Sequence, residues 1–478
     1  MKTLKKCLMV LVALMFVTSC NKVDTKLESQ IPADAVVVAK VDVLNVIKHS
    51  GIDFKDGKVV LPEKFAAMLK DMGEQFDDLD EVAKLFESGV DFKNSIYCFV
   101  PADGGKNAFV ALLPVADAKK LQAYIEDQVK AQMDDKGGIL VLEDVGRDVK
   151  LAISDDVLYV LSGSKQSADE CVKALAGLEK NISANELASK ALAVNDDLNV
   201  YFDNAFFQKS MGTAAMVPRA GVALELLKDV KGSAYHVSLA DGLRFKHESD
   251  IDASSDLAKL VTSVTDKPSA EFLSLMPKAK NAVVLGLSLN GEGILNLEMV
   301  KPYTEKLGGH AELVQLVDIF KSVKGPVTLG IASETLSPKD VSAVLAFKCG
   351  KTAELKSFLK GIVGADAYTE NGDELVVNQS LNGTTGSLVV KNGVVSVKYG
   401  KAYPENMGGV SGAKDAIGKS LCGFYAKVAD GNAEVELVSE TPDIKGGTST
   451  LTVTEGGKKL GVLDALAVIY NLTKKMPK

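Results

Sequence analysis

The chain repeats itself, and this internal similarity constrains its fold more than any single motif. IPADAVVVAKVDVLNVI near the N-terminus has the same plan as LMPKAKNAVVLGLSLNGEGIL in the second half. Further on, ALLPVADAKKLQAYIED parallels VLAFKCGKTAELKSFLKG, with Leu121 against Leu355 at an offset of 234. DVKLAISDDVLYVLSG then parallels TTGSLVVKNGVVSVKYG, with Gly163 against Gly400 at an offset of 237. Because the order and nearly the spacing are kept, we predict a tandem duplication.

The predicted repeats cover residues 31–268 and 269–478. Their junction is expected near TDKPSAEFLSLMP, where Pro268 and Pro277 interrupt helix-like and strand-like patterns. A chain of 478 residues also exceeds a single typical core, so at least two domains are expected.

Each predicted repeat alternates strand meanders with amphipathic helices. Runs such as AVVVAKVDV, VKLAIS and VLYVLSG indicate strands, and Asn392-Gly393 predicts a tight hairpin that matches Ser154-Asp155-Asp156 of the first repeat. Further hairpins are expected at Asp241-Gly242 and, in the second repeat, at Glu455 to Gly457. Helical periodicity marks LPEKFAAMLKDMGEQFDDLDEVAKLFESG, ADAKKLQAYIEDQVKAQM, SADECVKALAGLE and LDALAVIYNLTKKM. The predicted fold is α+β: two tandem lobes, each an antiparallel sheet with helices largely on one face.

The N-terminus predicts export and lipid attachment. Three Lys residues precede an apolar stretch, Cys7 to Val17, that is too short to span a bilayer, so residues 1–19 are expected to be a cleaved signal peptide. V-T-S-C is typical of the site at which a bacterial lipoprotein is cleaved and acylated, which makes Cys20 the expected lipidation site. Residues 20–30 are then expected to form a flexible polar tether.

The lipidation motif, the tether and the strand that opens each half together resemble a family of uncharacterised lipoproteins from gut-dwelling Bacteroidetes, known as a domain of unknown function. The resemblance implies a lipid-anchored protein of the cell envelope, with the outer membrane as the expected site. It implies no activity, substrate or catalytic residue. Acidic residues directly after the Cys often accompany surface export in such lipoproteins, and NKVDTK holds only Asp24, so the periplasmic and surface faces both stay open.

The charge of the chain argues against nucleic acid as a partner. Removing residues 1–19, which contain three Lys and no acidic residue, takes the formal charge from −8 to −11, and no Lys/Arg-rich run occurs elsewhere. The expected partners are the membrane, through the lipid anchor, and a protein or extracellular ligand.

We expect no metal site, cofactor or catalytic residue. His236 and His247 flank the Asp241-Gly242 hairpin and are expected as a surface or cross-strand pair, since no neighbouring ligand completes a metal set. Five acidic residues within 74–81 are expected on a solvated helix face, and DFKDGK lacks the oxygen ligands of a calcium loop. Nucleophile motifs such as G-x-S-x-G are absent from the sequence.

Four thiols follow Cys20, and spacing alone predicts no pairing among Cys98, Cys171, Cys349 and Cys422. Cys98 and Cys422 lie in apolar runs and are expected to be small buried side chains.

AKDAIGKS, residues 413–420, matches a relaxed phosphate-binding-loop pattern with Ala in place of the first Gly. Such a loop needs a strand before it and a helix after it, and here the order is reversed. Setting Leu421 on Leu198 also places Lys419-Ser420 opposite Asp196-Asp197, two carboxylates. We therefore expect no nucleotide, and interpret the stretch as a short helix, a turn and a strand present in both repeats.

Two classes of function remain from the sequence. The first is a lipid-anchored envelope protein with a non-catalytic binding or structural role, and the second is an envelope hydrolase whose catalytic residues are dispersed along the chain.

Overall fold

The computed structural model describes residues 25–475 except 56–57, 73–83, 103–108, 147, 205–228, 253, 256–257, 260–269, 297–299, 302–310, 336, 364, 373, 382–383, 402–406, 408–409 and 419. The chain divides into two compact units. The first combines the chain up to Pro218 with Val230–Asp250 and Leu460–Tyr470, and the second is mainly Ile251–Lys459. Residues 260–269, where the sequence places the junction, lie outside the described residues.

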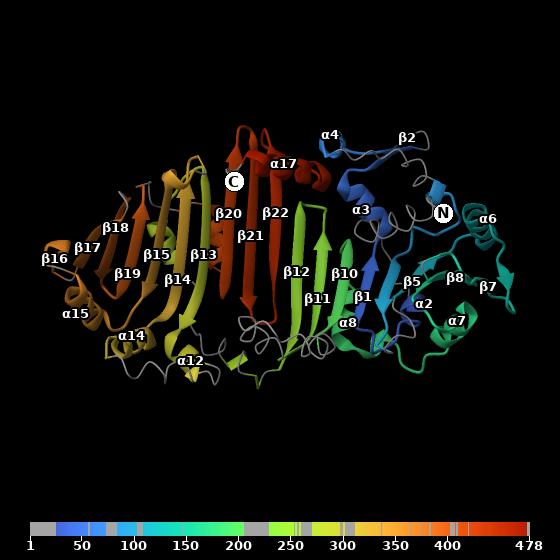
Figure 1. Cartoon of the computed structure of the whole chain (residues 1–478), viewed down its shortest axis with the longest axis horizontal. Coiled ribbons are helices and arrows are strands. Elements are labelled where there is room, and N and C mark those ends of the chain that lie inside the picture. The colour runs from blue at the N-terminus through green and yellow to red at the C-terminus, as the bar shows by residue number, and fades with distance from the viewer. Residues whose placement is uncertain are drawn as a thin grey trace. The chain divides into compact units, whose positions relative to one another are not determined.

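The first unit is built on an antiparallel sheet (Figure 1). In spatial order its strands are β6 (Asp134–Asp135), β7 (Leu140–Leu142), β8 (Val149–Ser154), β9 (Val157–Ser162), β5 (Phe109–Pro114), β4 (Ile96–Val100), β1 (Val37–Val41), β10 (Leu198–Asp203), β11 (Val230–Ser238) and β12 (Leu243–Ile251). Ring contacts of Tyr235 with Phe245 and His247, at 5.4 and 5.0 Å between centroids, join β11 to β12. A separate hairpin pairs β2 (Asp53–Lys55) with β3 (Lys58–Val60).

Helices cover both faces of this sheet. One face packs against α2 (Thr25–Glu28), α7 (Ala168–Ala176) and α8 (Glu186–Leu192), and the other against α3 (Val43–Ser50) and α6 (Ala118–Val129). The expectation of helices largely on one face is therefore wrong for this unit. The reason is visible in β4, β5 and β9, whose consecutive residues are apolar and almost all buried, as in strands covered on both sides. The remaining helices are η1 (Ile182–Ala184), α4 (Glu63–Asp71) and α17 (Val462–Lys475).

The structure differs from the expected tether at its last six residues. From Thr25 the chain is packed: Leu27 is 1% exposed within the core that α2 shares with the sheet. The Tyr97 hydroxyl donates to the Glu28 carboxylate over 2.9 Å, and the Tyr159 hydroxyl donates to the Gln30 side chain over 2.6 Å. A one-turn helix needs only one buried Leu, so no apolar periodicity marks it in the sequence.

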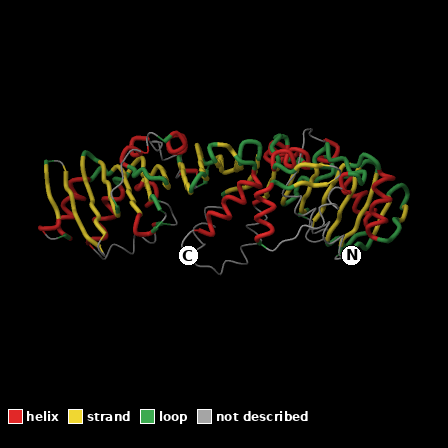
Figure 2. The backbone as a smooth tube through the Cα atoms, turned by 90° about the horizontal axis from the view of Figure 1, so that it is seen from above, coloured by secondary structure: helices red, strands yellow, loops and turns green. Residues whose placement is uncertain are grey.

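The second unit contains the same order of strands, again antiparallel, and Figure 2 shows in yellow how much of each unit is sheet. The strands are β16 (Tyr368–Asn371), β17 (Glu374–Leu381), β18 (Thr384–Lys391), β19 (Val394–Gly400), β15 (Val341–Lys348), β14 (Lys324–Ser333), β13 (Asn281–Asn290), β20 (Cys422–Asp430), β21 (Ala433–Asp443), β22 (Gly446–Glu455) and the short β23 (Lys458–Lys459). Its helices are η2 (Ala270–Leu275), α12 (Gly291–Leu295), α14 (Ala311–Lys321), η4 (Pro338–Asp340), α15 (Thr352–Ile362), η5 (Ala365–Ala367) and α16 (Ser411–Gly418).

Strand registers in the two units agree with the offsets read from the sequence. Pro114 pairs with Val157 at the end of β5–β9, and Lys348 pairs with Val394 at the end of β15–β19, offsets of 234 and 237. The next amide donates across the pair in both units: Val115 to the Asp156 carbonyl and Cys349 to the Gly393 carbonyl, over 2.7 and 2.8 Å.

The predicted turns are confirmed in place, with one change in their correspondence. Asn392 and Gly393 have φ of 50° and 78°, as a tight hairpin between β18 and β19 requires. The strand order matches β11–β12 with β21–β22, so the Asp241-Gly242 turn corresponds to the turn between Asp443 and Gly446. The turn at Glu455 to Gly457 instead leads into the additional strand β23.

Candidate functional site

A row of buried polar side chains crosses the first unit beneath α8. Lys40 on β1 lies opposite Asn199 on β10, which lies opposite His236 on β11, and each is at most 3% exposed. Lys40 Nζ donates to the Leu192 carbonyl oxygen at the C-terminus of α8 over 2.5 Å. The partial negative charge of a helix C-terminus favours a cation there. Burial lowers the pKa of Lys40, against the opposing effect of Glu28 and Asp42.

Asn199 holds the turn that follows α8 and orients His236. Its amide nitrogen donates to the carbonyl oxygens of Val194 and Asp196 over 3.0 and 3.3 Å. Its Oδ1 is thus the acceptor facing His236 Nδ1 at 2.7 Å, which assigns the proton to Nδ1. His236 Nε2 is buried and has no hydrogen-bond partner among the described residues. Burial also lowers the pKa of His236.

The arrangement nearest to a catalytic pair is His49 with Asp197. His49 Nδ1 lies 3.0 Å from Asp197 Oδ1, and the Leu239 amide donates to Asp197 Oδ2 over 2.6 Å. Asp197 is 2% exposed, whereas the His49 side chain is 21% exposed. A carboxylate and the histidine that it orients in this way supply two of the three members of a nucleophile-activating triad. In the part of the chain that the structure describes, no hydroxyl or thiol is hydrogen-bonded to His49. The pair therefore joins α3 to the loop before β10 without forming a triad.

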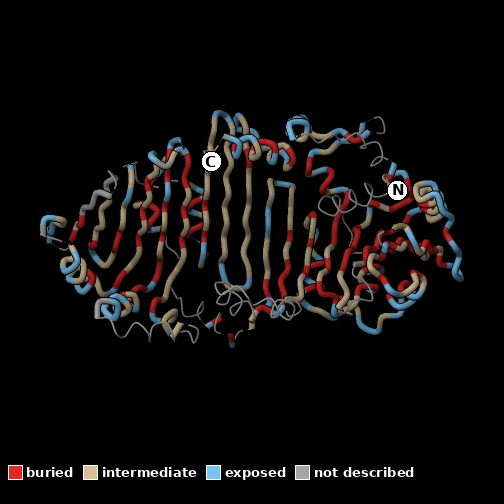
Figure 3. The backbone as a smooth tube through the Cα atoms, in the orientation of Figure 1, coloured by how far each residue is buried: buried red, intermediate tan, exposed pale blue. Residues whose placement is uncertain are grey.

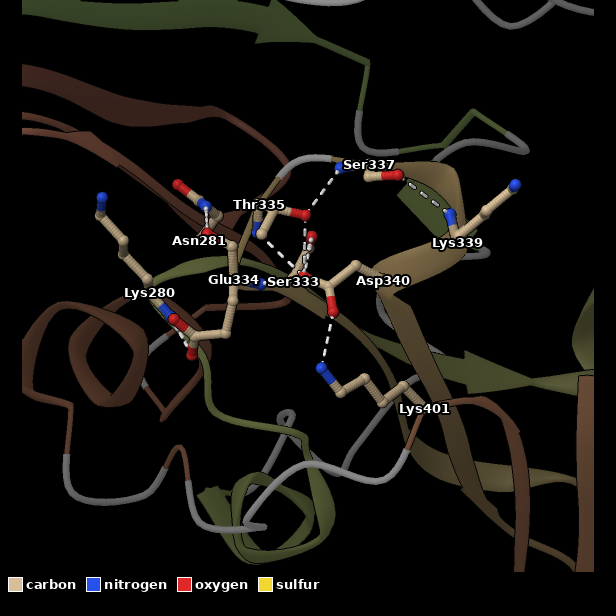
Figure 4. Close-up of polar contacts among 9 residues, drawn as sticks. All are labelled: Lys280, Asn281, Ser333, Glu334, Thr335, Ser337, Lys339, Asp340 and Lys401. Carbon is tan, nitrogen blue, oxygen red and sulfur yellow. Dashed lines mark hydrogen bonds and ion pairs between the residues drawn. The ribbon is translucent and has the colours of Figure 1, made fainter.

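Asp340 is the centre of a polar cluster in the second unit (Figure 4). Its Oδ2 accepts from the backbone amides of Glu334 and Thr335 over 3.0 and 2.9 Å, and from the Thr335 hydroxyl over 3.0 Å. Its Oδ1 forms an ion pair with Lys401 over 2.8 Å. These bonds saturate the carboxylate and tie the β14–β15 connection to the end of β19, so the cluster fixes a loop.

AKDAIGKS lies on α16 and the turn to β20, in the helix-then-strand order that the sequence indicates. Its small residues serve packing: Ala413, Ala416 and Ile417 are completely buried. A Cβ on Gly286 of β13 would lie 2.7 Å from Ile417, so the helix sits directly on the sheet. Of the two residues that would contact phosphate in such a loop, Ser420 is completely buried, and Lys419 lies outside the described residues.

The strand registers also shift the correspondence used for this stretch. Tyr201 pairs with Val38 and Tyr425 pairs with Val284, which aligns Tyr425 with Tyr201 and Ser420 with Asp196. The expected alignment of Leu421 with Leu198 is therefore one residue off. A single-residue slip exchanges the two faces of a strand, and only the pairing register distinguishes the alternatives.

The other predicted side chains lie apart from these clusters. His247 of β12 packs against Tyr235 of β11 and faces Ser249 across 2.7 Å. His236 follows Tyr235 on β11 and is 1% exposed, so the two His side chains lie on opposite faces of the sheet. The expectation of a surface or cross-strand pair is therefore wrong. Cys98, Cys171 and Cys349 are buried, whereas Cys422 is exposed, contrary to the expectation of burial, and none of these four described Cys residues forms a disulfide. Cys20 and the acidic residues within 74–81 lie outside the described residues.

Among the described residues, no group of three or more His, Cys, Asp or Glu side chains could hold a metal ion. None of the described helices combines the length and the apolar run that crossing a bilayer requires.

Similarity to known structures is weak. The chain resembles TP0453, solved in several crystal forms; form I has 9% identity over 48% of this chain and 80% of TP0453, with a TM-score of 0.30. A DNA polymerase sliding clamp from Pseudomonas aeruginosa shares 11% identity over 74% of this chain and 88% of the clamp, with a TM-score of 0.11. Similarities of this extent support no conclusion about fold or function. No curated protein sequence matches the chain.

A family model matches most of the chain, from residue 27 to residue 367. The match begins within α2 and ends within η5, so it includes the whole first strand meander and extends well into the second unit. The chain belongs to the family described as domain of unknown function DUF4836.

Proposed function

We propose that this protein is a lipid-anchored component of the cell envelope, attached through acylated Cys20 to the outer membrane, with a non-catalytic binding role. The observation that carries the proposal is the close succession of an acylation motif and a packed element. V-T-S-C ends at Cys20, and the packed helix α2 begins at Thr25. Four residues lie between them, and an extended chain advances at most about 3.5 Å per residue. An anchored first unit is then held within about 18 Å of its lipid.

We further propose that the two units arose by duplication, with each repeat beginning at a short helix. The support is the common strand order and the agreement of registers across it. Tyr97 of β4 pairs with Leu112 of β5, and Thr328 of β14 pairs with Ala346 of β15. Leu112 and Ala346 are separated by the offset of 234 found in the sequence. The helices α2 and η2 precede the first strand of each unit and bury Leu27 and Leu273. This correspondence starts the first repeat near Thr25 and the second near Ala270.

A binding role fits the use of the polar residues better than catalysis does. The buried row of Lys40, Asn199 and His236 stabilises a turn, and Asp340 stabilises a loop. The alternative, an envelope hydrolase, rests on the His49–Asp197 pair. A fluorophosphonate probe separates these proposals. Labelling of the native protein that disappears in His49→Gln would establish a hydrolase, whereas we expect no labelling above that of heat-unfolded protein.

Metabolic labelling tests the anchor. Cells that express the full chain are fed an alkyne analogue of palmitate, and we expect label on the wild-type protein and its recovery in the membrane fraction. Cys20→Ser should lose both. Cys7→Ser, which changes the other N-terminal Cys within the expected signal peptide, is the matched control and should keep both. Label retained in Cys20→Ser would contradict the proposal.

A further inference from the structure

The second unit leaves an apolar sheet face outside its own cores. Cross-strand register places seven side chains in one row, from β19 to β22: Tyr399, Ala343, Ile331, Val283, Ala426, Leu437 and Leu451. A parallel row runs from Val397 through Leu285 to Phe424. We name these two rows the open face. Seven strands at a spacing of about 4.8 Å give it a width of about 29 Å.

The open face is accessible over β14 and β19, whereas Val453, two residues from Leu451 on the same side of β22, is 2% exposed and marks a covered border. Ile331 is 37% exposed and Tyr399 is 48% exposed. Figure 3 shows β20, β21 and β22 as intermediate in burial along most of their length. The two core clusters of this unit contain none of the residues of the open face: one packs α16 and η2 on the opposite side, and the other packs α14 and α15 beside it.

The corresponding face of the first unit is covered. There Cys98, Ala111 and Val160, in positions matched by register to Leu329, Leu345 and Val397, are at most 8% exposed. They lie in a core with Val43 and Ile47 of α3. Alternation of apolar and polar residues along an antiparallel strand normally means that the apolar side is covered. Thr450, Leu451 and Thr452 follow this pattern on β22.

We infer that the open face of the second unit binds the acyl chains of an individual lipid molecule. This inference deepens the proposed binding role by naming its ligand class. The described side chains of the two rows carry no charge, and the only hydroxyl among them is that of Tyr399, at one end. Ser439 and Ser449 continue the second row onto β21 and β22, and their hydroxyls are hydrogen-bonded to each other over 2.8 Å. The strand backbones are paired with one another, so few polar groups are free. A protein partner forms about one hydrogen bond per 100–200 Å² of interface, whereas an acyl chain needs none.

Two further observations favour a single lipid over a bilayer surface. The third row, through Phe347 and Val395, continues the same side of the sheet beneath Ile319 of α14 and Leu355 of α15. A helix of about 10 Å diameter at this border stands above the strands and keeps a flat bilayer surface from reaching them. A flexible acyl chain can lie along the strands beside the helix. The formal charge of −11 without residues 1–19 also disfavours attraction to anionic headgroups.

Titration with dansyl-labelled undecanoic acid tests the inference. The protein is residues 21–478, which include every described element and lack Cys20, so failure of lipid attachment and failure of probe binding are separate results. We expect a saturable rise in fluorescence. Leu451→Glu, on the open face, should raise the Kd at least tenfold. Thr450→Glu adds the same charge to the adjacent residue on the opposite face and should change the Kd less than twofold.

Ile331→Ser is a second variant of the open face, chosen because Ile331 is exposed and its replacement should leave the fold intact. It should raise the Kd about threefold. Circular dichroism and the unfolding midpoint of each variant show whether it is folded. Absence of saturable binding to the folded wild-type protein would overturn the inference, as would equal losses in Leu451→Glu and Thr450→Glu. Binding to phosphatidylethanolamine/phosphatidylglycerol vesicles without binding to the monomeric probe would assign the face to a bilayer. A dimer that Leu451→Glu dissociates in sedimentation experiments would assign it to a second copy.

Discussion

At the scale of single residues, the two units solve one packing problem with different side chains. Beneath α8 the sheet presents Lys40 and Asn199, whose polar groups reach up to the carbonyls at the helix end. Beneath α16 the register-matched residues are Gly286 and Gly423, and the helix descends onto the sheet instead. Both arrangements avoid unpaired or colliding groups at a helix C-terminus. The burial of Lys40 and Asn199 is thus explained by packing.

His236 should make stability depend on acidity. Burial lowers its folded pKa below the unfolded value of about 6.5, so below that pH the unfolded chain binds more protons. We therefore expect the contribution of His236 to the free energy of unfolding to be constant above about pH 6.5. Below that pH, protonation of His236 in the unfolded chain should lower the stability as the pH decreases. Glu248 and Asp196 oppose this shift, and Lys246 and Arg244 reinforce it.

The measurement is the urea midpoint from pH 7.5 to pH 5, compared with the His236→Asn variant, which should show a shallower slope. An NMR titration in which the His236 imidazole protonates at or above the unfolded value would contradict the prediction.

At the scale of elements, short helices contribute through the few side chains that they bury. The helix α16 has eight residues, and its contact with β20 depends on glycine. The helix α2 has four residues and depends on Leu27. Helices this short are not stable alone, so tertiary packing holds them.

Gly423→Ala should destabilise the second unit by about 3 kcal/mol, because the added Cβ would overlap the Ala416 carbonyl oxygen and push α16 away from β20. Gly361→Ala is the control: it lies in α15 with open space around it, and should stabilise by about 0.8 kcal/mol through helix propensity. Chemical denaturation measures both. Equal effects of the two substitutions would mean that α16 does not pack as described.

Leu27→Ala should cost about 3 kcal/mol, because the side chain is completely enclosed between α2 and the sheet. Lys26→Ala, which removes the exposed ion pair with Asp156, should cost less than about 1 kcal/mol. If both variants unfold at the wild-type urea midpoint, residues 25–30 are a free tether after all.

At the scale of the whole molecule, each unit carries its own cores. The second unit contains two clusters of buried side chains, centred on α16 with η2 and on α14 with α15. The order of strands places β13 at the centre of its sheet, between β14 and β20. A unit that arose by duplication and folds by itself needs its own buried core and a paired central strand.

Residues 270–459, expressed alone, should therefore fold and unfold cooperatively. A shorter chain, residues 270–400, lacks α16 and β20–β22 and should not, because β13 loses its partner on one side. Circular dichroism with urea denaturation compares the two chains. An unfolded 270–459 segment would argue against independent repeats.

The sequence by itself determined the alternation of strands and helices, the hairpin at Asn392-Gly393 and the offsets of 234 and 237, because these depend on local periodicity, turn chemistry and matched spacing. Only the tertiary structure decided that helices cover both faces of the first sheet, since consecutive apolar residues do not indicate what covers each side. It also decided the roles of Lys40, Asn199 and Asp197, whose partners lie across strands distant in sequence. Burial and register are properties of assembled strands, and no local pattern encodes them.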